Sequence, residues 1–128
     1  MISIILVALA AICNAVMDVI SFHYKQYIFS RYNPQWWNPA ISWKNKYIDW
    51  DNDVRMEKRI SIGNIFSIKY PTFLTDAWHF FKSSMLALLG LAIILYKPCV
   101  NPFVDGVIIG LAWNLIFNVF YNKVFKKH

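Results

Sequence analysis

The chain has 128 residues, and its composition is that of a membrane protein rather than of a soluble domain. Hydrophobic residues make up 58% of it and aromatic residues 18%, while charged residues make up only 16%. Soluble domains carry about 25% charged residues, so the composition argues against a soluble monomer and against disorder. Two cysteines are too few for a disulfide framework. The length favours a single domain, residues 1–128.

Three apolar segments predict an all-α membrane protein with three transmembrane helices. In the first, Asn14 and Asp18 are the strongly polar side chains. Its 21 residues form a helix of roughly 31 Å, about the thickness of a bilayer core. No Lys or Arg precedes this segment, so we expect an uncleaved span rather than a signal peptide. The expected spans are residues 2–22, 75–96 and 103–122.

Basic residues are distributed unevenly around the expected spans. Nine lie from Lys25 to Lys82 and three follow the last span, whereas Lys97 lies in the turn between the second and third spans. Because basic loops remain in the cytoplasm, we expect the N-terminus outside, the 24–74 segment inside and the C-terminus cytoplasmic. The net charge of +6 indicates attraction to anionic lipid headgroups. No nucleic-acid partner is expected, because no nucleic-acid-binding motif accompanies the charge.

The 24–74 segment is expected to lie at the cytoplasmic interface, with short helices and one β-hairpin. Residues 59–62 and 65–68 alternate as strands do, and Gly63–Asn64 between them suits a two-residue turn. Four tryptophans are expected at the headgroup level, where an indole ring has one wet and one apolar side. They are Trp36, Trp37, Trp43 and Trp50.

Polar residues inside or beside the spans form three pairs at helical spacing. Each pair shares one helix face, because residues three or four apart are neighbours on a helix. At about 1.5 Å per residue, Asp18 and Asn118 lie about 6–8 Å from the cytoplasmic surface, and all three pairs lie in that leaflet. Ionisable groups within a membrane are costly and usually functional. The pairs are Asn14 with Asp18, Asp76 with His79, and Asn114 with Asn118.

If these pairs face one another, they provide the ligands of a divalent metal ion. Carboxylates and imidazole bind zinc, manganese or iron, so we expect Asp18, Asp76 and His79 to act as metal ligands and catalytic residues. His23 can join them only where the first span frays, because a regular helix turns it roughly 140° from Asp18. The amides expected to orient the ligands are Asn14, Asn114 and Asn118.

The first hypothesis is a metal-dependent hydrolase or transferase that acts on lipid headgroups. A bound metal would activate water against a phosphoester or acyl ester. No HExxH, paired-histidine or GxSxG motif accompanies the site. Nearby cations would hold the substrate phosphate, namely Lys44, Lys46, Arg59 and Lys82.

Two other functions remain open at the level of sequence. In a non-enzymatic structural or partner-binding membrane protein, the polar pairs would act as hydrogen-bond glue between helices. In an oligomeric channel, Asp18 would line a pore. Gly106 and Gly110, with Gly90 across the hairpin, predict close helix packing within the chain or in a homo-oligomer. Asp105 is expected to complement the dipole of the third helix.

Two phrases of this sequence resemble a group of uncharacterised small bacterial and phage integral membrane proteins. They are WNPAISWKNKY at residues 37–47 and TDAWH at residues 75–79. The resemblance covers the cytoplasmic segment and the start of the second span, and it implies that the Ser42–Tyr47 stretch and the Asp76–His79 pair belong to one recurring design. We expect the protein to lie in a bacterial inner membrane. No activity is assigned to that group, so the resemblance lends no catalytic residues.

Overall fold

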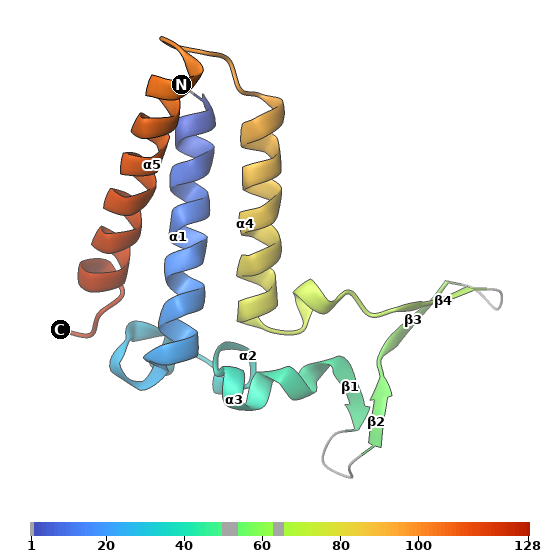
Figure 1. Cartoon of the computed structure of the whole chain (residues 1–128). Helices are drawn as coiled ribbons and strands as arrows, with labels where there is room; N and C mark the ends of the chain where they lie inside the picture. The colour runs from blue at the N-terminus through green and yellow to red at the C-terminus, as the bar shows by residue number, and fades with distance from the viewer. Residues whose placement is uncertain (1, 50–53, 63–65) are drawn as a thin grey trace.

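Three long helices lie side by side in the computed structural model, and the first of them lies between the other two (Figure 1). All three are long and apolar enough to cross a membrane. The second helix begins later than expected, because Asp76 caps it, and the third continues as a π-helical turn, η5, Phe120–Val124. The long helices are α1, Ile2–Phe22, α4, Ala77–Ile94, and α5, Pro102–Val119.

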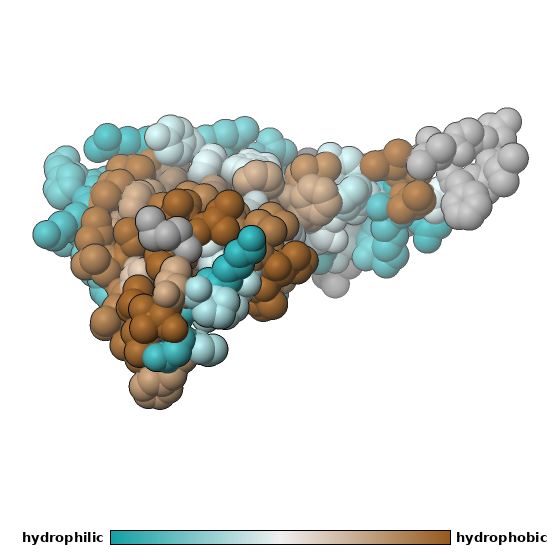
Figure 2. Space-filling view, turned by 90° about the horizontal axis from the view of Figure 1, so that it is seen from above, coloured by the Kyte–Doolittle hydropathy of each residue, from teal (hydrophilic) through white to brown (hydrophobic). Residues whose placement is uncertain are grey.

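Small side chains allow α1 to pack closely against its neighbours. Ala10, Ala11 and Ala15 of α1 are fully buried, and Val19 and Ile20 continue the buried surface toward its C-terminal end. The outer sides of α4 and α5 are apolar and exposed. Figure 2, which views the molecule from the end where the N-terminus lies, shows hydrophobic residues in brown on this surface. This distribution suits helices surrounded by lipid, because apolar side chains need no protein cover there.

Two Asn–Pro steps begin short helices in the segment after α1. Asn33 and Asn38 each accept a backbone N–H two residues later, and each is followed by a proline at the first helical position. Asparagine and proline are favoured at these two positions. The short helices are η1, Tyr24–Gln26, η2, Ile28–Arg31, α2, Pro34–Trp37, α3, Pro39–Ser42, η3, Trp43–Lys46, and η4, Thr72–Leu74.

Two antiparallel two-stranded ribbons form an arm that extends from the base of the helices (Figure 1). The expected antiparallel pairing after Lys58 is present, but Ile62 lies opposite Phe66 and Ile60 opposite Ile68, one residue away from the register that a two-residue turn would give. Lys69 Nζ lies 2.6 Å from Glu57 Oε2. This hydrogen bond holds the pKa of Glu57 below its usual range. The strands are β1, Tyr47–Asp49, β2, Val54–Glu57, β3, Arg59–Ile62, and β4, Phe66–Lys69. The structure describes residues 2–49, 54–62 and 66–128. The expected turn at Gly63–Asn64 lies outside the described residues, and so does Trp50.

Aromatic rings and the C-terminal tail close the end of the molecule opposite the N-terminus. The Phe29 ring stacks on Trp37 at 4.8 Å between centroids and lies 5.0 Å from Phe125. The backbone N–H of Ile28 donates to Phe125 O at 3.0 Å. Trp36 and Trp37 are therefore packed within the chain and half-buried, while Trp43 is more exposed.

A buried carboxylate closes the turn between α4 and α5. Asp105 accepts hydrogen bonds from Tyr96 Oη at 2.9 Å, Cys99 N at 2.8 Å and Val100 N at 3.2 Å. Asp105 therefore does more than complement the helix dipole. Asn101 caps α5 by accepting the N–H of Val104.

The glycines of α4 and α5 do not mark a close approach within the chain. A Cβ atom added at Gly90, Gly106 or Gly110 would meet no atom within 4 Å. The expectation that Gly90 packs against the glycine step across the hairpin is therefore wrong. The other interpretation of Gly106 and Gly110, close packing against a second copy of the chain, stays a prediction.

Candidate acid–base site at the start of helix α4

Asp76 and His79 form a hydrogen-bonded pair at the first turn of α4. Asp76 Oδ2 lies 2.7 Å from His79 Nδ1, and Asp76 Oδ1 accepts the backbone N–H of His79 at 2.9 Å. Thr75 Oγ1 donates to Asp76 Oδ2 at 3.1 Å. The carboxylate side chain is 4% exposed and the imidazole 35% exposed. The pair thus combines a buried carboxylate with a histidine that reaches the surface.

This pair lines an open cavity of about 330 Å³ between α1, α3 and α4. Trp43 and Trp78 give it aromatic sides, and Ser21 and Ser42 contribute hydroxyl groups. Asp76 engages Nδ1 of His79, so Nε2 is the ring nitrogen left for proton exchange. A histidine held in this way by a carboxylate is suited to general acid–base chemistry.

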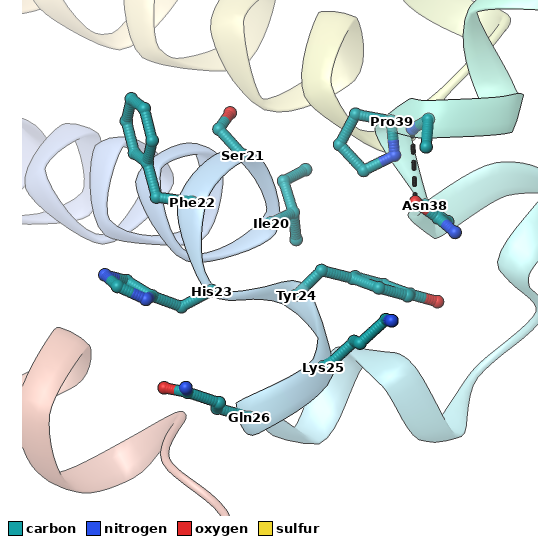
Figure 3. Close-up of a pocket in the computed structure, with 10 residues that line it drawn as sticks. Ile20, Ser21, Phe22, His23, Tyr24, Lys25, Gln26, Asn38 and Pro39 are labelled. Carbon is teal, nitrogen blue, oxygen red and sulfur yellow. Dashed lines mark hydrogen bonds between the residues drawn. The ribbon is translucent and has the colours of Figure 1, made fainter.

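A second open cavity, of about 660 Å³, adjoins the first and shares Ser21 and Pro39 with it. Its lining runs from the end of α1 into η1, with Asn38 and Pro39 across from that segment (Figure 3). Tyr24 and Lys25 extend toward the side of Asn38, whereas His23 extends the other way. Burial raises the pKa of Tyr24.

Asn45 connects elements near the first cavity. Its residue type alone did not mark it as a functional residue. Its side-chain N–H groups donate to Gln35 O at 2.6 Å and to Thr75 O at 2.8 Å. It thereby joins α2 to the residue before the helix cap. The sequence signal for it was its place in the WKNKY phrase, which carries no structural pattern by itself.

Asp18 lies in α1, and His23 follows the last residue of that helix. The ring centroids of His23 and Tyr121 are 6.0 Å apart. Among the residues that the structure describes, no three His, Cys, Asp or Glu side chains are grouped so as to hold a metal ion. Asp18 therefore does not join Asp76 and His79 as a third ligand. Two donors from one helical turn are fewer than the three protein ligands typical of a catalytic zinc site.

Two of the three asparagines expected to orient the ligands, Asn114 and Asn118, bond within α5 rather than to the pair. Asn114 donates to Gly110 O at 3.0 Å and Asn118 donates to Asn114 O at 2.8 Å, so their amides bond along α5 itself. Both are exposed, and Asn14 is half-buried in α1.

Cations expected to hold a phosphate lie at different places. Lys82 lies over the ring of Trp78 at 4.7 Å from its centroid, which brings its charge to the wall of the first cavity. Lys44 and Lys46 lie over Trp43 and Tyr47 at 5.7 Å and 5.2 Å. Arg59 donates to Ser67 Oγ at 3.2 Å in the ribbon of β3 and β4. Lys82 and Lys44 are therefore the two of these cations that lie over aromatic walls of the first cavity.

The described geometry thus provides a carboxylate-oriented imidazole, two nearby hydroxyls and two cations over the aromatic walls of an open cavity. These groups can move a proton to or from an oxygen atom and can hold a negative charge. Comparisons of the chain with protein-family models, with curated proteins and with solved structures find no match.

Proposed function

We propose that this chain is an integral membrane protein that hydrolyses or transfers an ester of a lipid headgroup, with His79 as general base. It lies in the inner membrane of a bacterium, with the N-terminus outside and the base of the helices at the cytoplasmic surface. The hydrogen bond of 2.7 Å between His79 Nδ1 and the buried Asp76 carries the proposal.

In this reaction Asp76 holds the imidazole in the tautomer whose Nε2 accepts a proton. His79 takes that proton from water or from a hydroxyl group at the cavity, and returns it to the leaving oxygen. The positive charge of Lys82, held over Trp78, stabilises the negative charge of the headgroup or of the transition state. No step needs a resident metal ion.

A lipid headgroup suits this place because the pair lies where an apolar helix begins. Asp76 precedes the first residue of α4, a helix with the composition of a membrane span. A group at that level is about as deep as the ester and phosphate groups of a bilayer. The cavity is open, so a headgroup can reach it from the surface.

The test is to incubate the purified chain in vesicles of phosphatidylethanolamine and phosphatidylglycerol and to measure products by mass spectrometry. We expect turnover that falls about 10²-fold or more in His79→Gln and in Asp76→Asn, as for loss of a general base. His128→Gln is the matched control, since His128 lies at the C-terminus and bonds to Lys123 O. No turnover of either lipid, or equal turnover in all variants, would contradict the proposal.

Chelation separates this mechanism from the metal site expected from the sequence. Turnover that persists in EDTA supports the Asp76–His79 pair alone. Turnover that is lost in EDTA and restored by zinc, manganese or iron would support a metal ion held by the pair together with the substrate or a second copy.

A non-enzymatic structural role is the second candidate, favoured by the helix-capping bond of Asp76. The Oδ1 atom already satisfies the N–H of His79, and Asn45 ties the preceding residue to α2. In that case His79→Gln would lower thermal stability in vesicles and would change no lipid product.

A further inference from the structure

We infer that α5 is the contact through which two copies of this chain pair in the membrane, with Asn114 and Asn118 at the centre of the contact. The inference rests on the membrane location proposed above. It does not depend on the proposed catalysis.

The two amides lie opposite the side by which α5 packs within the chain. Asp105 is buried and Ile109, Ala112 and Ile116 are half-buried. At 100° per residue, Asn114 and Asn118 lie about 160° from Ile116, on the opposite face. Both side chains are exposed, as are Val107, Leu111 and Leu115 around them.

Their depth makes this exposure costly in lipid. The apolar segment runs over 23 residues to Val124, and Asn114 lies about 18 Å from its start and about 15 Å from its end. Asn114 is thus near the middle of the bilayer, where neither water nor a headgroup can bond to it. A polar group there seeks a protein partner.

The existing bonds leave the Asn114 amide incomplete, whereas Asn118 Oδ1 already accepts from Asn122 Nδ2 at 3.4 Å. The Asn114 amide nitrogen donates one bond to Gly110 O, and an amide carries two N–H donors and an oxygen acceptor. Within the residues that the structure describes, no hydrogen bond to Asn114 Oδ1 is found, and its second N–H is available. An asparagine amide is self-complementary, because its oxygen can accept from the same group of a second copy.

A second copy of the chain would place its own Asn114 and Asn118 at the same depth in the membrane. Two copies inserted in the same orientation are related by an axis along the membrane normal, so their α5 helices run parallel and each residue faces its equivalent. Gly110 is adjacent to Asn114 on this face, and a Cβ there would meet nothing in the chain itself. A small residue beside a polar one allows two helix backbones to approach and their amides to bond.

The test measures association in vesicles by energy transfer between full-length chains labelled at Lys97→Cys, in a Cys13→Ala, Cys99→Ser background. Integration is first checked by resistance to carbonate extraction, so that failure of membrane location is recognised separately. We expect energy transfer that rises with the protein-to-lipid ratio and saturates. Asn114→Leu should weaken association about tenfold or more.

Two glycine variants provide a matched pair. Gly110→Leu adds a side chain to the proposed contact and should abolish energy transfer, whereas Gly90→Leu adds the same side chain to α4 and should leave it unchanged. Both positions have open space in the single chain, so loss of folding does not explain a difference between them. A monomer at every ratio, or association unaffected by Asn114→Leu and Gly110→Leu, would overturn the inference.

Discussion

Asp76 uses its two carboxylate oxygens for different purposes. Oδ1 accepts the backbone N–H of His79 and caps α4, while Oδ2 bonds to the imidazole Nδ1 and to the hydroxyl of Thr75. Because the side chain is almost fully buried, each of these bonds is shielded from water and gains strength from the low local dielectric. One residue therefore sets both the start of the helix and the orientation of the candidate base.

We expect Asp76→Ala to lower the free energy of unfolding by about 1–2 kcal/mol, because the first turn of α4 loses its cap. Asp76→Asn should lower the free energy of unfolding by less, since asparagine caps helices about as well as aspartate. Chemical unfolding in micelles, followed by far-ultraviolet circular dichroism, measures the difference. Asn101→Ala is the matched control, because Asn101 caps α5 in the same way and lies far from the candidate acid–base pair in the chain. Equal stability of Asp76→Ala and the unmodified chain would contradict the capping role.

The turn between α4 and α5 is held by one side chain rather than by a regular turn pattern. Asp105, in the first turn of α5, reaches back to two backbone N–H groups of the turn and to the hydroxyl of Tyr96 beyond the end of α4. Burial, and then the bond to Asp105, raises the pKa of Tyr96. The stabilising bond is therefore fully present below the ordinary tyrosine range near pH ~10 and is lost as the pH rises through the raised pKa.

Three variants at this turn should follow a definite order of thermal stability. Asp105→Ala leaves two backbone N–H groups and a phenol without an acceptor and should lower the Tm most, by several degrees. Asp105→Asn keeps one oxygen acceptor and should lie between, and Tyr96→Phe removes a single bond and should lower the Tm least. Thermal unfolding in micelles, followed by tryptophan fluorescence, gives the order. A Tyr96→Phe chain no more stable than Asp105→Ala would show that the backbone bonds contribute little.

Hydropathy predicted where the three helices lie, since each long apolar run is a helix within a few residues. It could not predict which face of α5 packs, because that helix is apolar on most sides, and the amides of Asn114 and Asn118 mark one face without indicating whether it packs within the chain or lies outside. The expected convergence of Asp18, Asp76 and His79 depended on such rotations. The i,i+3 pair could be predicted because a single helical turn fixes it, whereas the hydrogen bonds of Asn45 to Gln35 and Thr75 depend on tertiary packing.

The orientation of the whole molecule can be tested with its own cysteines. Cys99 is exposed beside the turn that joins α4 to α5, and Cys13 is buried in α1. The basic residues gather at the other end, where Lys126 pairs through the backbone with Tyr27. Because positively charged ends stay in the cytoplasm, Cys99 should face the outside of the cell.

A maleimide that does not cross membranes should therefore label the native chain in intact cells, and Cys99→Ser should abolish the label. In that variant, a cysteine placed by Lys126→Cys should react only after the cells are made permeable. The two positions lie at opposite ends of α5 and its continuation, so one span separates them and their reactivities must be opposite if that helix crosses the bilayer. Labelling of both in intact cells would argue against a spanning α5, and reversed labelling would place the candidate base on the outer face of the membrane.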